Sequence, residues 1–178
     1  MTTKKSSDAV PFQPIGIAVL TVSDSRTQAE DTSGDLLAER IGDAGHYLCD
    51  RKLVKDDPET IRSVVSEWRD RSDVHVVLST GGTGLTGRDS TVEVFEQLFT
   101  KHIVGFGELF RMLSYQDIGT STINSRASGG LSDTTLLFCL PGSTGACRLA
   151  WDSILAPQLD VRTRPCNLVQ LIPRFDES

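Results

Sequence analysis

One glycine-rich segment of the chain has the composition of a phosphate-binding loop. Residues 81–84, with the sequence Gly-Gly-Thr-Gly, directly follow an apolar run, and Gly87 ends the segment before a predicted helix start. Glycines let successive backbone N–H groups converge on an anion because no Cβ stands in the way, and a following helix adds the positive end of its dipole. Asp89 comes directly after the loop, so an anion cradle and a carboxylate lie together.

A second carboxylate, Asp56, also precedes a predicted helix. Mg²⁺ takes one or two protein carboxylates together with phosphate oxygens and water, so Asp56 and Asp89 would suit magnesium-assisted nucleotidyl transfer. Asp89 has a structural alternative as a helix cap, for which Ser90 competes. Asp57 is best explained as an N-cap, since a proline and an acid follow it as in a helix first turn.

The spacing of residues 82–87 matches two nucleotide-binding fingerprints. As GxGxxG it suggests a dinucleotide fold. In that fold the last glycine lies inside the helix and an acid ends the second strand about 20 residues later, whereas here the helix is predicted to start after Gly87 and the region near Glu108 is predicted to be helical. The Walker A spacing also fits, yet Arg88 and Asp89 replace the required Lys-Ser/Thr. The glycines could also serve only a tight turn, although their unfolded-state entropy favours a ligand as the reason for them. An NAD-binding Rossmann oxidoreductase is a remote alternative.

Hydrophobic patterning predicts strands that alternate with helices. Strands are expected at residues 15–22, 47–54, 74–79 and 135–140, and helices near residues 31–45, 58–70, 90–98, 108–113 and 147–155. This order predicts an α/β fold with three α/β/α layers and a mostly parallel sheet, in which ligands collect at the carboxyl ends of the strands. Asp24, Asp56, the glycine loop and the segment Pro141-Gly142-Ser143 would share that edge.

Three local predictions are more specific. Ser90 and Glu93 have the spacing of a capping box. Residues 119–132 have no clear period, so a loop is expected there, with a short hairpin at Gly129-Gly130. The last helix is expected to end before Pro157.

Composition limits the classes of function. The 178 residues suit one domain at 14–178 behind a mobile polar tail at 1–13, with 38% apolar residues for a core. A formal net charge of −6, without a basic cluster, argues against nucleic acid. No apolar run reaches the roughly 20 residues that span a bilayer. The four cysteines lack metal-binding spacing and no secretory segment precedes them, so a reduced, cytoplasmic protein is expected.

Several motifs together resemble the MoaB/Mog family of molybdenum cofactor biosynthesis. They are residues 21–26 (Thr-Val-Ser-Asp-Ser-Arg), 79–84 (Ser-Thr-Gly-Gly-Thr-Gly), Arg88-Asp89, 105–108 (Gly-Phe-Gly-Glu) and 141–143 (Pro-Gly-Ser). The resemblance covers residues 14 to 173. Residues 31–34, 110–114, 118–122 and 163–167 are more similar to the MoaB branch than to the Mog branch.

The resemblance implies adenylylation of molybdopterin by ATP with Mg²⁺ and release of pyrophosphate. It implies that Asp56 and Asp89 are catalytic and hold Mg²⁺, and that Ser23 and Asp24 bind the pterin. It assigns nucleotide-phosphate contacts to Gly81, Gly82, Thr83, Gly84, Pro141, Gly142 and Ser143. Lys55 stands where the adenylyltransferases usually have proline.

The resemblance also implies a homotrimer or a hexamer of trimers, with other molybdenum cofactor biosynthesis proteins as further partners. Some MoaB proteins lack the acids of the active pattern, and a non-catalytic molybdopterin-binding or assembly protein is therefore the alternative. The presence of Asp24, Asp56 and Asp89 favours an enzyme.

Overall fold

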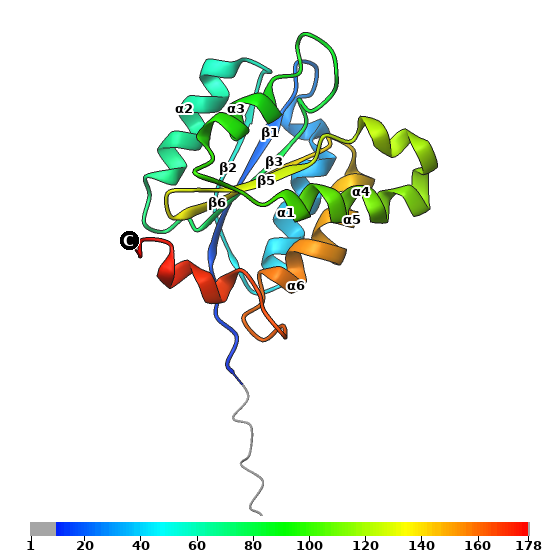
Figure 1. Ribbon diagram of the computed structural model, residues 1–178. Helices are drawn as coiled ribbons and strands as arrows, with labels where there is room; N and C mark the ends of the chain where they lie inside the picture. Colours follow the sequence, from blue (N-terminus) through cyan, green and yellow to red (C-terminus); the bar gives the residue numbers. More distant parts are fainter. Residues whose placement is uncertain (1–9, 178) are drawn as a thin grey trace, which may run out of the picture.

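A single six-stranded sheet forms the centre of the computed structural model, which describes residues 10–177 (Figure 1). Most of the predicted tail, residues 1–9, lies outside the described residues. The Phe12 ring packs at a tilt against the His46 ring, with centroids 5.1 Å apart, and the Arg162 guanidinium lies 5.0 Å from the Phe12 ring centroid. The strands are β1 (Gly16–Val22), β2 (Tyr47–Val54), β3 (Val76–Thr80), β4 (Lys101–His102), β5 (Ser128–Ser132) and β6 (Thr135–Leu140).

The sheet is mostly parallel, as predicted. Its strand order is β2-β1-β3-β6-β5-β4, in which β2, β1, β3 and β6 run parallel while β5 is antiparallel to both of its neighbours. Thr80 of β3 is in register with Thr21 of β1 and Leu140 of β6. The carboxyl ends of these three strands are therefore level, and the loops that follow them open at one edge.

Helices cover both faces of the sheet, with α2 and α3 on one face and α1, α4 and α5 on the other (Figure 1). Side chains of β1 alternate between the two layers: Val19 belongs to the core beneath α1, and Leu20 to the core beneath α2. The main helices are α1 (Thr32–Asp43), α2 (Pro58–Arg69), α3 (Thr91–Leu98), α4 (Val104–Ile118) and α5 (Thr144–Ala150). Within residues 10–177, no helix has the length and apolar character needed to cross a membrane.

Capping residues set the start of two helices where the sequence predicts them. The Asp31 carboxylate accepts a hydrogen bond from the Gly34 N–H at 3.0 Å at the start of α1. Asp57 accepts one from the Thr60 N–H at 2.8 Å at the start of α2. Each side chain satisfies a first-turn N–H that has no partner within its helix.

The hairpin turn predicted at Gly129-Gly130 is wrong, because both glycines lie within β5. A Cβ on Gly129 would stand 2.7 Å from Phe138, and one on Gly130 would stand 2.3 Å from Phe99. Because these glycines carry no side chain, Phe138 and Phe99 can pack directly against β5. The turn between β5 and β6 lies instead at Asp133, which has a φ of 52°, and the residues before β5 form a 3-10 helix, η2 (Gly119–Asn124).

The last helix also differs from the prediction, since helical structure continues past Pro157. After α5, residues Trp151–Leu155 form a π-helical segment, and α6 (Ala156–Gln158) follows. The Ala156 N–H donates to the Trp151 carbonyl, five residues back. Pro157 therefore lies within one continuous helical run, directly after the π-helical segment.

Candidate nucleotide-binding site

A pocket of about 640 Å³ lies at the carboxyl ends of β1, β3 and β6. We call it the glycine-loop pocket. Its lining comes from the loops that follow these strands, from Asp56 in the loop between β2 and α2, and from Asn124 of η2. The lining residues are Val22, Ser23, Asp24, Ser25, Arg26, Asp56, Gly81, Gly82, Thr83, Gly84, Thr86, Arg88, Asp89, Asn124, Pro141 and Gly142.

Nearly all residues predicted for the site therefore line one pocket, and Ser143 is the exception. Its hydroxyl accepts a hydrogen bond from the Ala146 N–H at 3.2 Å and caps α5. The Ser23 hydroxyl is also engaged locally, since it accepts a hydrogen bond from the Arg26 N–H at 3.1 Å. Both side chains shape turns beside the pocket.

The glycine loop leaves β3 through two residues in the left-handed region. Gly81 has a φ of 94°, and a Cβ there would stand 2.1 Å from the Val22 carbonyl oxygen. Gly82 has a φ of 62°, and a Cβ there would stand 2.2 Å from the Thr91 hydroxyl and 2.5 Å from Asp56 Oδ2. Only glycine fits such close approaches in this conformation. The tight loop thus brings its backbone against the Asp56 carboxylate.

Asp56 is buried at 7% exposure and is held by Ser90. Its Oδ1 accepts hydrogen bonds from the Ser90 N–H at 3.1 Å and from the Ser90 hydroxyl at 2.6 Å. Burial raises the pKa of the Asp56 carboxyl, and the nearby charges of Asp89 and Asp24 add to this, while Ser90 opposes it. Asp56 is therefore a desolvated carboxylate that favours a cation nearby.

The predicted capping box at Ser90 and Glu93 is wrong. Ser90 occupies the N-cap position of α3, but its side chain makes no capping hydrogen bond, because the hydroxyl donates to Asp56 instead. Glu93 contacts Arg126. Sequence spacing could not reveal that Ser90 bonds to Asp56, since the two residues are 34 positions apart.

Asp89 stabilises the glycine loop itself. Its Oδ2 accepts hydrogen bonds from the Thr86 N–H at 3.0 Å and from the Thr86 hydroxyl at 2.5 Å. The Thr86 hydroxyl is the main cause that lowers the pKa of Asp89. Asp89 does not cap α3. Because its pKa is lowered while that of Asp56 is raised, Asp89 is the member of the pair that stays ionised at lower pH.

Two arginines, which the sequence motifs contained but to which no role was assigned, also line the pocket. Arg88 forms an ion pair with Asp24, and this is the main cause that lowers the pKa of Asp24. Arg26 donates to the Gly142 carbonyl oxygen and to the Ser33 hydroxyl, each at 3.0 Å. It therefore joins the loop after β1 to the loop after β6.

The histidines and cysteines lie away from this chemistry. His46 Nδ1 accepts a hydrogen bond from the Ile15 N–H, and His75 Nδ1 accepts one from the Gly16 N–H. The four cysteines are free, and Cys139 and Cys147 are buried. Over residues 10–177 there is no group of three or more His, Cys, Asp or Glu side chains that could hold a metal ion.

A comparison with known protein families shows to which family this chain belongs. The model of the probable molybdopterin binding domain matches residues 18–161, most of the chain. The chain belongs to the molybdopterin-binding domain family.

Relatives align with the chain over most of their length, and solved structures among them share its fold. Molybdenum cofactor biosynthesis protein B of Escherichia coli (strain K12) is 52% identical over 162 residues, which cover 91% of this chain and 95% of the relative. A crystal structure of a molybdenum cofactor biosynthesis protein B superposes with a TM-score of 0.80 at 46% identity, covering 83% of this chain and 92% of that one. A MogA structure superposes with a TM-score of 0.70 at 25% identity, covering 81% and 97%. The predicted membership in a molybdenum cofactor biosynthesis family is confirmed.

This molybdopterin-binding domain differs from both nucleotide fingerprints. Its α3 begins at Thr91, after the loop, so Gly87 does not pack inside a helix as the dinucleotide fingerprint requires. Arg88 pairs with Asp24 and stands where a P-loop has its lysine. The glycine loop therefore matches neither the dinucleotide-binding fingerprint nor the P-loop.

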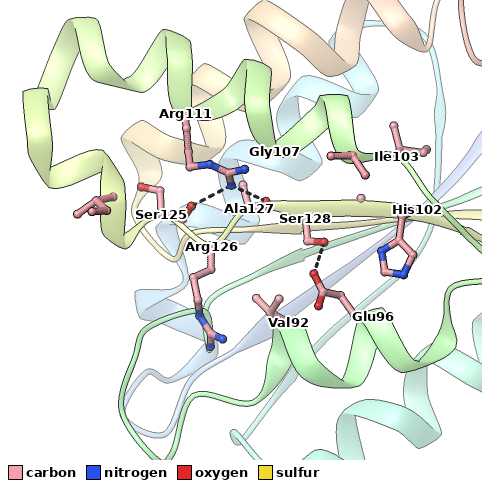
Figure 2. A pocket seen from close by; sticks show the side chains of 13 residues that line it. Val92, Glu96, His102, Ile103, Gly107, Arg111, Ser125, Arg126, Ala127 and Ser128 are labelled. Carbon is pink, nitrogen blue, oxygen red and sulfur yellow. Dashed lines mark hydrogen bonds between the residues drawn. The ribbon is translucent and has the colours of Figure 1, made fainter.

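A second pocket of about 410 Å³ lies at the β5–β4 edge of the sheet, between α3, α4 and β5 (Figure 2). We call it the edge pocket. Arg111 Nη1 donates to the carbonyl oxygens of Ser125 and Ala127, and the Ser128 hydroxyl donates to Glu96. Arg126 Nε donates to the Thr83 carbonyl oxygen at 3.0 Å, which ties this edge to the glycine loop.

Proposed function

We propose that the protein transfers the adenylyl group of ATP to molybdopterin. The terminal phosphate of the pterin would attack the α-phosphorus of ATP, and pyrophosphate would leave. The convergence of the glycine loop, Asp56 and Asp89 in one pocket carries this proposal. Phosphate transfer of this type depends on positioning and on neutralising charge, which a cradle of N–H groups and a cation supply.

The two acids suit Mg²⁺. One oxygen of each carboxylate is held in place, Asp56 Oδ1 by Ser90 and Asp89 Oδ2 by Thr86. Mg²⁺ favours one or two protein carboxylates with phosphate oxygens and water, so a full protein cage is not required. Asp56 and Asp89 would hold the ion, which when bound would neutralise the charge on the phosphates.

Other residues of the chain would bind the two substrates. The backbone of Gly81, Gly82, Thr83 and Gly84 would contact the ATP phosphates, with Pro141, Gly142 and Ser143 on the neighbouring loop. Ser23 and Asp24, on the loop after β1, would face the pterin. Burial of Asp56 supports this arrangement, because a desolvated carboxylate gains most from a bound cation.

The alternative is a protein of the same pathway that binds molybdopterin without turnover. The E. coli relative is named for its place in cofactor biosynthesis, and this name leaves the reaction open. The acids at positions 24, 56 and 89 favour catalysis over binding alone. Exchange of the pterin with other proteins of the pathway would fit either function.

We further propose that copies of the chain associate through α4 and η2. Large apolar side chains are exposed along this segment: Val104 at 65%, Leu109 at 38%, Met112 at 59%, Tyr115 at 58%, Ile118 at 50% and Ile123 at 80%. Exposed apolar residues so close together mark an association surface. The homotrimer or hexamer implied by the family resemblance would cover them.

Release of pyrophosphate tests the proposed reaction. Purified protein is incubated with molybdopterin and MgATP, and the Asp89→Asn variant is expected to lose about 100-fold or more of the turnover, because the carboxylate charge is gone while the side-chain size is kept. Asp57→Asn is the matched control: Asp57 caps α2 outside the pocket lining. Equal turnover in wild type and Asp89→Asn would refute the catalytic role, and tight pterin binding without turnover would support the alternative.

A further inference from the structure

The ion pair between Arg88 and Asp24 forms part of the lining of the glycine-loop pocket. Arg88 Nε lies 3.0 Å from Asp24 Oδ2, and Arg88 Nη2 lies 2.9 Å from Oδ1 and 2.8 Å from Oδ2. The guanidinium therefore grips the carboxylate with a bidentate fork. The two side chains are 70% and 42% exposed, and both residues line the pocket.

Such a pair is easily exchanged. An exposed ion pair adds little to stability, because water screens both charges. Two oxygens of a tetrahedral phosphate can accept hydrogen bonds from the guanidinium fork, as the two oxygens of a carboxylate do, and a di- or triphosphate carries more negative charge. A phosphate chain that enters the pocket would thus compete well for Arg88.

The two partners differ in how firmly they are held. Asp24 Oδ1 also accepts a hydrogen bond from the Asp56 N–H at 3.2 Å, which fixes the carboxylate to the loop between β2 and α2. Arg88 follows Gly87, and a Cβ added to Gly87 would have no neighbouring atom within 4 Å outside the adjacent residues. Arg88 makes no hydrogen bond through its side chain to a described residue other than Asp24. Of the two partners, Arg88 is therefore the one that depends on the ion pair alone for its hydrogen bonds.

We infer that Arg88 is a phosphate-binding residue that rests on Asp24 until a di- or triphosphate enters. On binding, its guanidinium would transfer to the phosphate oxygens, and the Asp24 carboxylate would become available to the second substrate. This inference rests on the proposed function, since it takes the glycine-loop pocket as the site of the ATP phosphates.

A double-mutant cycle tests the exchange, with calorimetric binding of magnesium pyrophosphate as the readout. Arg88→Ala is expected to weaken binding about 10- to 50-fold, the size of a lost charge-assisted hydrogen bond. Asp24→Asn is expected to strengthen binding about threefold, because it weakens the hold on Arg88. In the Arg88→Ala background, Asp24→Asn should give clearly less gain, since there is no arginine left to release.

Arg174→Ala is the matched control. Arg174 grips Glu177 with a similar fork at 3.0 to 3.1 Å, and its side chain is 65% exposed, but neither residue lines the pocket. This variant should bind magnesium pyrophosphate like the wild type.

Each outcome has a distinct meaning. An equal gain from Asp24→Asn with and without Arg88 would show that only the removal of a negative charge matters, and would overturn the exchange. Unchanged binding in Arg88→Ala would do the same while leaving the proposed function intact. A wild type that binds neither magnesium pyrophosphate nor MgATP would overturn the proposed function itself.

Discussion

The glycine-loop pocket and the edge formed by α4, η2 and β5 differ in what fills their surfaces. The pocket is lined by glycines, acids and arginines whose side chains are engaged with one another, as in the contacts of Ser90 with Asp56 and Arg88 with Asp24. Along α4 and η2, by contrast, large apolar side chains such as Met112 and Ile123 are exposed, at 59% and 80%.

This contrast separates two physical tasks. A preorganised polar site binds a small charged ligand because its donors and carboxylates are already fixed before the ligand arrives. An exposed apolar face gains free energy only when another surface covers it. Arg126 connects the two regions, because it contacts Glu93 and donates to the Thr83 carbonyl oxygen of the glycine loop.

Of the variants considered, Gly82→Ala should have the largest effect, because it disrupts the glycine-loop pocket. The new Cβ would clash with the Thr91 hydroxyl and Asp56 Oδ2 at a φ of 62°, so the free energy of unfolding should fall by about 2–5 kcal/mol and MgATP binding should be lost. Chemical denaturation and calorimetry measure both effects. Gly87→Ala is the control in the same loop, since nothing lies within 4 Å of its Cβ position and its stability should hold. Similar losses in both variants would contradict this account of Gly82.

Charge placed on the apolar face should act on assembly and leave the pocket intact. Met112→Glu and Ile123→Glu should lower the molar mass measured by light scattering, because a desolvated carboxylate opposes burial. Leu171→Glu, at a residue that is 43% exposed on a different segment, η4 (Val169–Arg174), should not. A monomeric wild type, or an unchanged mass in Ile123→Glu, would rule out association through this face.

The smallest effect is expected from two buried hydroxyls that make no hydrogen bond with the described residues, one in each region: Thr91 beside the pocket and Ser132 at the end of β5. Thr91→Val and Ser132→Ala should each raise the free energy of unfolding by up to about 1 kcal/mol, because an unsatisfied buried hydroxyl is destabilising.

The two variants should differ in function. Thr91→Val should also weaken MgATP binding, since its hydroxyl faces the Asp56 carboxylate across Gly82, whereas Ser132→Ala should leave binding unchanged. If Thr91→Val binds MgATP normally, the hydroxyl serves no purpose in the pocket.

Much of the fold could be predicted where the signal is local. The strand Tyr47–Val54 and the helix Pro58–Arg69 follow from alternation and from a cap followed by proline. The strand β5 was missed, because Gly129 and Gly130 are typical of turns and their place in a strand depends on Phe138 and Phe99, which lie elsewhere in the sequence. The helical continuation past Pro157 likewise depends on a π-helical turn that no local pattern announces.

The sequence by itself determined which loops carry the polar groups, because strands that end in glycines and acids specify their own turns and helix starts. Only the tertiary structure decided how these groups pair. Asp24 meets Arg88 across 64 residues, and Asp56 meets Ser90 across 34. The order of the strands in the sheet brings these loops to one edge, so the charge and burial of each carboxylate depend on neighbours that its own segment does not contain.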